Sequence, residues 1–162
     1  MSKSFGVYKS PIGEIYIVSN KENITRLELF KENWEKYYNK NKELIRDDNS
    51  SMFLKAASQL EEYFKGERTK FELPISVEGT EFQKQVWAAL LEIPYGETRC
   101  YADIAHTIGR DKAVRAIGQA NKVNALPIII PCHRVIGKNG SMVGYAGSNI
   151  DVKIKLLELE KN

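Results

Sequence analysis

The stretch that decides the fold is TRCYADIAHTIGRDKAVRAIGQA, residues 98–120. Apolar residues recur at helical spacing up to Gly109, and a second set follows after a short polar turn. Two short helices joined by a glycine-containing turn are typical of a helix-turn-helix. The sequence therefore predicts one helix from Thr98 to Gly109 and another from about Asp111 to Ala120.

The residues on either side of this pair predict further elements of the same domain. Thr80 can cap a helix whose apolar face ends at Leu91, before the break at residues 94–96. Residues 126–131 form a wholly apolar segment that is too short and too rich in proline for a helix. Residues 152–159 follow a glycine-rich loop and predict a closing amphipathic helix.

The N-terminal third has the pattern of a small sheet. Residues 5–9, 14–18 and 24–30 are rich in β-branched and aromatic residues, and turn-forming residues separate them. These runs predict a three-stranded antiparallel meander. Residues 31–51 are dense in Lys, Asn and Glu, which indicates a solvated loop or an irregular helix. Residues 52–64 predict a helix that Gly66 closes.

Together these elements predict an α+β protein with two domains. A small N-terminal antiparallel sheet with a helix occupies residues 1–78, and a mainly helical domain with the helix-turn-helix occupies residues 79–162. The length of 162 residues suffices for this arrangement. No signal-peptide core or membrane-length apolar run is present, so we expect a cytoplasmic protein, with a monomer as the default.

Charge and cysteine content narrow the function classes. The formal net charge of +3 does not by itself indicate nucleic-acid binding, which would need a locally basic face. The two cysteines, Cys100 and Cys132, show no metal-ligand spacing, so we expect neither a metal nor a cofactor. Cys100 has the usual interpretation of a lone intracellular cysteine, a buried small hydrophobe.

The second helix of the predicted pair is built from small residues. Ala116 and Gly118 would let its backbone approach another surface closely, and Arg115 stands beside them. A packed helix–helix contact explains such residues as well. A glycine within a helix costs about 1 kcal/mol relative to alanine, however, and close approach to a DNA groove would offset that cost. Lys112 and Lys122 at the two ends suit phosphate contacts.

The run Pro131-Cys132-His133-Arg134-Val135 carries the chemistry. The thiolate is the nucleophilic form of cysteine, and an imidazole can remove its proton directly or through a water molecule. The imidazole needs an orienting group, for which Glu158 and Glu160 on the last helix are both candidates.

Several motifs, in order, make residues 80–160 resemble the O6-alkylguanine-DNA alkyltransferases. They are the Pro-Cys-His-Arg-Val run after Ile128-Ile129-Ile130, the Gly144-Tyr145-Ala146-Gly147 loop, Ile93-Pro94-Tyr95-Gly96-Glu97 and Arg115-Ala116-Ile117-Gly118. The family has a ribonuclease H-like N-terminal domain. The sequence departs from the family pattern at Ala125, where a proline is usual, and it lacks the zinc ligands of some members.

The resemblance implies a role for each matching residue. Cys132 would accept the alkyl group irreversibly and once only, and His133 would deprotonate it through a water molecule. Glu160 would hold the imidazole, with Glu158 as its rival. Asn124 would brace the segment before the cysteine, and Tyr101 would donate a proton towards the leaving guanine.

The resemblance also implies the partner, which is double-stranded DNA bearing O6-alkylguanine, with O4-alkylthymine as a second candidate substrate. The protein would bind through the minor groove, and Arg115 would fill the gap left by the flipped nucleotide. The backbone of Val135 and the loop of Tyr145, Ala146 and Gly147 would line the guanine pocket. Three other functions remain: a thiol hydrolase, a non-reacting protein that binds alkylated DNA, and a transcriptional regulator.

Overall fold

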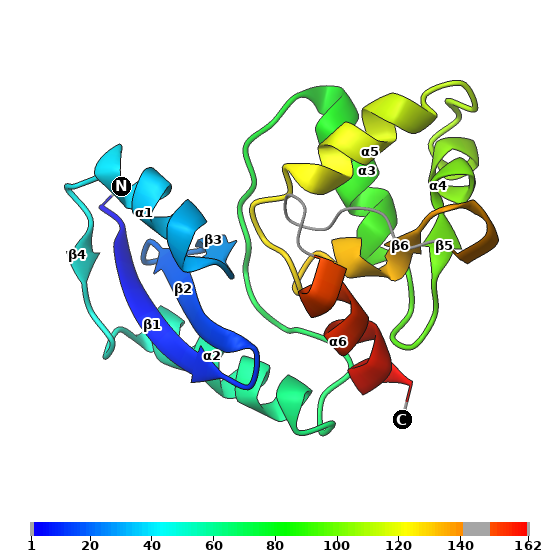
Figure 1. Ribbon diagram of the computed structural model, residues 1–162. Helices are drawn as coiled ribbons and strands as arrows, with labels where there is room; N and C mark the ends of the chain where they lie inside the picture. Colours follow the sequence, from blue (N-terminus) through cyan, green and yellow to red (C-terminus); the bar gives the residue numbers. More distant parts are fainter. Residues whose placement is uncertain (1, 141–149, 162) are drawn as a thin grey trace. The chain divides into compact units, whose positions relative to one another are not determined.

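The computed structural model describes residues 2–140 and 150–161, and the chain divides into two compact units, Met1–Val77 and Glu78–Asn162 (Figure 1). The first unit carries a sheet with two helices, and the second unit is mainly helical. The prediction of an α+β fold is confirmed.

The first unit is built on a four-stranded sheet in the order β3-β2-β1-β4. Its elements are β1 (Ser4–Ser10), β2 (Gly13–Ser19), β3 (Ile24–Glu28), α1 (Lys31–Asn39), β4 (Ile45–Arg46) and α2 (Ser51–Phe64). The first three strands form the predicted antiparallel meander. The prediction missed β4, a two-residue strand that pairs in parallel with β1.

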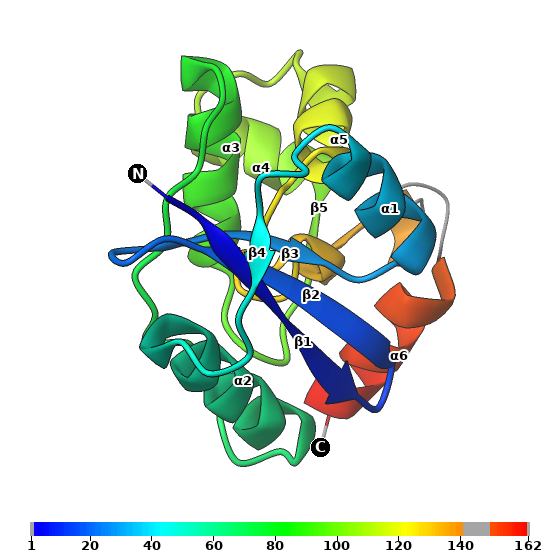
Figure 2. The same ribbon diagram turned by 90° about the vertical axis from the view of Figure 1, so that its left-hand side faces the viewer.

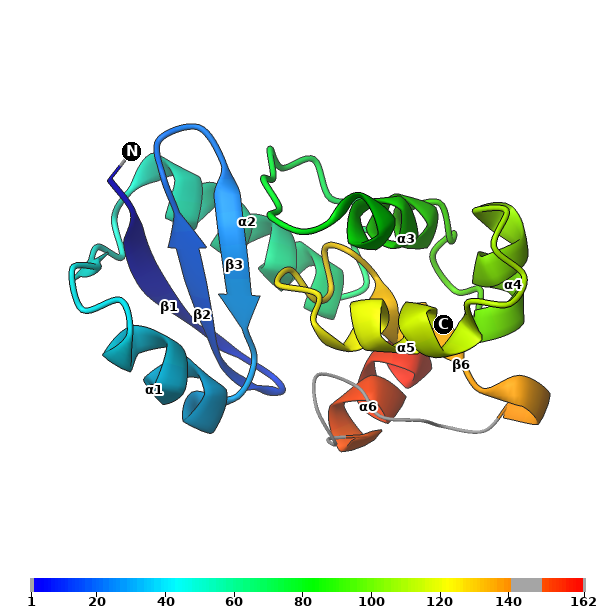
Figure 3. The same cartoon turned by 90° about the horizontal axis from the view of Figure 1, so that it is seen from above.

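The two helices of this unit cover opposite faces of the sheet (Figures 2 and 3). On one face Trp34 of α1 stacks on Tyr16, with ring centroids 4.8 Å apart. On the other face Phe53 of α2 lies so close to Gly6 that a Cβ there would overlap its ring. The prediction of a solvated loop or irregular helix at residues 31–51 was therefore wrong for α1, a regular helix that buries its tryptophan.

The second unit begins with α3 (Glu81–Leu91), whose start Thr80 fixes as predicted. The Thr80 hydroxyl accepts from the amide of Gln83, and the Gln83 side chain accepts in return from the Thr80 amide. The other elements are β5 (Arg99–Cys100), α4 (Tyr101–Thr107), α5 (Val114–Lys122), η1 (Cys132–Arg134), β6 (Val135–Ile136), η2 (Lys138–Gly140) and α6 (Ile150–Glu160).

The predicted helix-turn-helix consists of α4 and α5, and both helices begin about three residues later than predicted. Helix α4 cannot begin at Thr98 because Arg99 and Cys100 extend as β5 and pair in parallel with Val135 and Ile136 of β6. This pairing places Tyr101, the first residue of α4, beside the strand that follows the cysteine turn. No helix in the described ranges is long and apolar enough to span a membrane.

Candidate active site

The segment before the cysteine is a tight apolar turn held by one asparagine. The Asn124 amide nitrogen donates to the carbonyl of Ile130 at 2.9 Å, and its oxygen accepts from the amide of Leu126 at 2.9 Å. Ile128 has a φ of 75°, a conformation that β-branched residues rarely adopt. The two Asn124 bonds therefore brace a strained turn before the cysteine.

Cys132 is buried at the start of η1, with 2% of its surface exposed. Its amide donates to the Ile130 carbonyl at 2.7 Å, and its own carbonyl accepts from the Asn121 side chain at 3.3 Å. Neither cysteine forms a disulfide. The expectation that Cys100 is buried was wrong, because the residue is half-exposed and its sulfur accepts from the first turn of α4.

His133 and Glu160 form a buried pair. The Nε2 atom of His133 lies 2.6 Å from Oε2 of Glu160, and both side chains are buried. Burial lowers the pKa of His133 below its usual value, although the hydrogen bond to Glu160 opposes this. We therefore take the imidazole as neutral at neutral pH. A neutral ring that donates from Nε2 leaves Nδ1 as the basic nitrogen.

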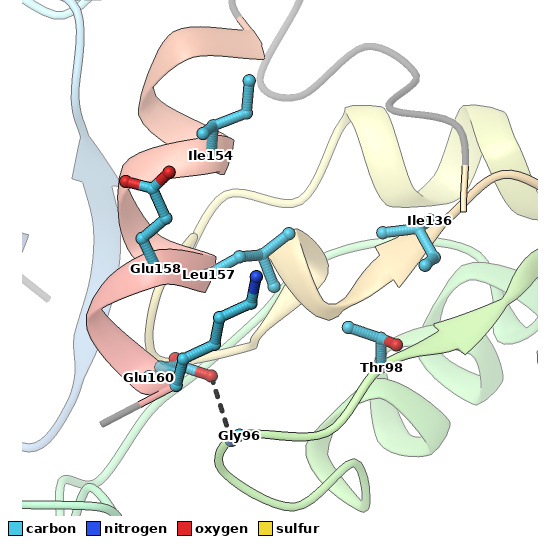
Figure 4. Close-up of a pocket in the computed structure, with 8 residues that line it drawn as sticks. Gly96, Thr98, Ile136, Ile154, Leu157, Glu158 and Glu160 are labelled. Carbon is cyan, nitrogen blue, oxygen red and sulfur yellow. Dashed lines mark hydrogen bonds between the residues drawn. The ribbon is translucent and has the colours of Figure 1, made fainter.

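The structure places Glu160, and not its rival Glu158, on the histidine. The Glu160 carboxylate also accepts from the Nε and Nη2 atoms of Arg134, at 2.8 and 3.1 Å, and from the amide of Gly96 at 3.3 Å. Glu158 is exposed on α6, and its carboxylate points away from Gly96 (Figure 4). The residue pattern alone did not show that Arg134 would share this carboxylate.

Two other side chains are electrostatically coupled to the cysteine. Lys153 is completely buried, and its ammonium donates to the carbonyl of Val135 at 2.6 Å. Burial lowers the pKa of Lys153 from 10.5 to about 8, and negative charge on Cys132 opposes that shift. The pKa of Tyr101 is raised by burial and by the charge of Cys132, so its hydroxyl keeps its proton at neutral pH. Sequence reasoning identified Tyr101 and missed Lys153.

The residues expected to contact DNA lie on or beside α5. Lys112, Arg115, Ala116 and Lys122 are exposed, and Gly118 is half-buried. A Cβ at Gly118 would come no closer than 4.0 Å to the Tyr101 ring, which is ordinary contact. Packing among the described residues therefore does not require a glycine at position 118. No contact among these residues offsets the cost of a glycine inside a helix.

A hollow of about 470 Å³ lies behind Glu160 (Figure 4). It is lined by Gly96, Thr98, Ile136, Ile154, Leu157, Glu158, Glu160 and Lys161. Cys132 is not among the lining residues, so this hollow is not the expected guanine pocket. Of the residues assigned to that pocket, Val135 is buried, and Tyr145, Ala146 and Gly147 lie outside the described residues. Across residues 2–140 and 150–161, no group of three potential ligands could hold a metal ion.

Two family models together match almost the whole chain. Residues 81–162 match the family described as 6-O-methylguanine DNA methyltransferase, DNA binding domain, and residues 4–77 match its ribonuclease-like domain. The constitutive methylated-DNA–protein-cysteine methyltransferase of Bacillus subtilis is 50% identical over 156 residues, which are 94% of this chain and 92% of the relative. The Methanosarcina barkeri methylated-DNA–protein-cysteine methyltransferase is 47% identical, over 98% and 97% of the two chains.

Solved structures agree as well. The Mycobacterium tuberculosis O6-methylguanine methyltransferase matches with a TM-score of 0.89 at 42% identity, over 98% of this chain and 93% of that one. The M. tuberculosis OGT in complex with DNA matches with a TM-score of 0.87, over 98% and 92%. The chain belongs to the 6-O-methylguanine DNA methyltransferase family.

Proposed function

We propose that this protein repairs DNA directly by moving an alkyl group from O6 of guanine to the sulfur of Cys132. The observation that carries the proposal is the buried arrangement of Cys132 beside His133 and Glu160, with a 2.6 Å bond between the last two. Membership of the family supplies the substrate class. The assignment of residues 1–78 to the sheet-and-helix domain and 79–162 to alkyl transfer is part of the proposal.

The transfer forms one carbon–sulfur bond and breaks one carbon–oxygen bond. The thiol proton of Cys132 passes through a water molecule to Nδ1 of His133, while Glu160 keeps the ring oriented. The thiolate attacks the carbon on O6, and the guanine leaves with the bonding electron pair. Tyr101, whose raised pKa keeps its hydroxyl protonated, donates a proton towards the leaving base. The reaction needs no metal or cofactor.

The product explains why the reaction occurs once for each molecule. A thioether on Cys132 is not hydrolysed by a neutral imidazole, so the thiol is not regenerated. The protein is therefore a stoichiometric acceptor. Its thiol must stay reduced to act, which suits the cytoplasm.

Access to the substrate requires that the nucleotide leave the duplex. The O6 carbon is unreachable in stacked DNA, and flipping costs a few kcal/mol. The exposed face of α5 provides the contact surface: Arg115 enters the gap in the minor groove, while Ala116 and Gly118 allow close approach. Lys112 and Lys122 bind phosphates. A monomer suffices, since every residue named here belongs to one chain.

Intact-mass measurement after incubation with a duplex containing O6-methylguanine tests the proposal. We expect a gain of one methylene on Cys132, restored guanine, and a stop after one equivalent. Cys132→Ala should bind DNA without reacting, while Cys100→Ser should react normally. Continuing turnover would indicate a thiol hydrolase, and binding without a mass change would indicate a non-reacting damage binder or a regulator.

Three further variants test the residue roles. Arg115→Ala should slow the repair of duplex DNA much more than the reaction with free O6-benzylguanine, and an equal loss on both would contradict base flipping. Glu160→Gln should slow both reactions, whereas Glu158→Gln should change neither. The opposite order for the two glutamates would refute the assignment of Glu160.

A further inference from the structure

We infer, on the basis of the transfer reaction proposed above, that Arg134 is a positioning residue that divides Glu160 between two partners and so keeps His133 a neutral base. The residue follows Cys132 and His133 in the same short turn, η1. It needs no contact with the substrate for this role, because it acts through the carboxylate.

The contacts of the Glu160 carboxylate show how it is divided. Oε2 accepts from both His133 and Arg134, at 2.6 and 3.1 Å, and Oε1 accepts from Arg134 at 2.8 Å. The guanidinium therefore meets both oxygens, and the imidazole meets one. The Glu160 side chain is 1% exposed, so water does little to weaken this competition.

The guanidinium is itself held in place. Its Nη1 atom donates to the carbonyl of Ile93 at 2.7 Å, and its centre lies 5.7 Å from the centre of the Tyr95 ring. Arginine stays protonated at all working pH values, and its planar fork fits a carboxylate at two points. The negative charge of Glu160 is thus already balanced before His133 gains or loses a proton.

Charge balance decides whether His133 can act as a base. An anionic partner raises the pKa of an imidazole, and a fully available buried carboxylate would hold the ring protonated at neutral pH. A protonated ring cannot accept the proton of Cys132. Among the described residues, the other charged or titratable groups near the pair are Lys153 of α6, Tyr95 of the turn after α3, and Cys132 itself. Burial is the largest cause that lowers the pKa of His133, and the charges of Arg134 and Lys153 lower it further, against the effect of Glu160.

The histidine titration can be followed directly because the chain has only two histidines, His106 and His133. Nitrogen-15 NMR of the full-length protein reports the tautomer and the protonation midpoint of each, and His106→Asn assigns the signals. In the wild type we expect His133 to be neutral at neutral pH, with its proton on Nε2. In Arg134→Gln we expect its midpoint to rise by at least about one unit.

Two variants control this measurement. Arg26→Gln breaks a partly buried Arg–Glu pair in the first unit, 3.1 Å long, and should leave His133 unchanged. Arg134→Lys keeps the charge but loses the two-point contact, so it should raise the midpoint by less, about half a unit. An unshifted His133 in folded Arg134→Gln overturns the inference. If that variant does not fold, an unshifted His133 in Arg134→Lys overturns it.

The pH profile of transfer to Cys132 gives a second readout. With O6-benzylguanine and a Cys100→Ser background, we expect the rate of Arg134→Gln to fall below that of the wild type as the pH is lowered from 8.5 to 6.5, and to match it at pH 8.5. A merely structural role would reduce the rate by the same factor at every pH, which would overturn the inference. Failure of the wild type to transfer at all would instead refute the proposed function, and the NMR titration would still decide the role of Arg134.

Discussion

Lys153→Met should change how stability depends on pH, because Lys153 is a buried ammonium. The Lys153 side chain is fully buried, and its ammonium donates a hydrogen bond to the carbonyl of Val135 at 2.6 Å. Burial lowers the pKa of Lys153 from 10.5 to about 8. Methionine has a similar length and no charge, so the substitution removes the titration and keeps most of the packing.

The pKa values fix the sign of the effect. Between pH 8 and 10.5 the unfolded chain keeps the Lys153 proton and the folded chain loses it, so the contribution of this group to stability rises with pH. A difference of about 2.5 units in pKa corresponds to about 3 kcal/mol over that window. At neutral pH the buried ammonium destabilises the wild type, and Lys153→Met removes this cost of about 3 kcal/mol. The substitution also removes the hydrogen bond to the carbonyl of Val135, which costs the variant about 1–3 kcal/mol.

Urea unfolding from pH 7 to 10.5 tests this reasoning. We expect the free energies of unfolding of the two proteins to differ little at pH 7. By pH 10.5 we expect the wild type to be more stable than the variant by about 2–3 kcal/mol. Tyrosine titration affects both proteins equally and cancels in the difference. In a Cys132→Ala background the window should extend to lower pH, because the charge that opposes the shift is gone. Parallel stability curves for wild type and variant would refute the buried-ammonium argument.

Three substitutions outside the charged cluster test how the site is supported. Asn124→Ala leaves the amide of Leu126 and the carbonyl of Ile130 without this partner, so urea unfolding should show a loss of about 2–4 kcal/mol, and transfer should slow while DNA affinity is kept. Thr80→Ala removes the cap of α3 and should cost about 1 kcal/mol in the same assay, with an unchanged transfer rate. Ile128→Gly relieves about 1–2 kcal/mol of strain but loses a buried side chain worth about 2–5 kcal/mol, so thermal unfolding should show a net loss; a rise in Tm would mean that strain dominates.

The sequence predicted the elements that have a periodic pattern. The three long strands and the helices that begin near residues 51, 81 and 150 each repeat an apolar face, so their positions followed from spacing. Strands β4, β5 and β6 have two residues each, and two residues carry no period. Helix α1 was predicted only as a solvated loop or an irregular helix, because Trp34 is its single buried residue within a charged run.

The charged residues around the cysteine were harder to predict because their partners are distant in sequence. Arg134 donates to Glu160, which lies 26 residues away in the sequence, and Lys153 donates to Val135, which lies 18 residues away. A signal for the last helix was nevertheless present. Lys153 lies three residues before the apolar Leu156, and Glu160 lies four residues after it. Residues at these spacings share one face of a helix. Glu158 lies two residues before Glu160 and so falls on the opposite face of the helix. The buried face therefore identifies Glu160, and not Glu158, as the partner of His133.

These side chains form a buried group in which positive charge outweighs negative charge while Cys132 is a thiol. Arg134 and Lys153 carry two positive charges, Glu160 carries one negative charge, and His133 is neutral. The positive charge of Lys153 attracts a thiolate at Cys132, and this attraction favours the nucleophilic form of the cysteine. Alkyl transfer converts that thiolate into a neutral thioether. The spent protein then lacks the negative charge that opposes the lowering of the Lys153 pKa, so we expect the buried ammonium to destabilise the alkylated product more than the thiolate form.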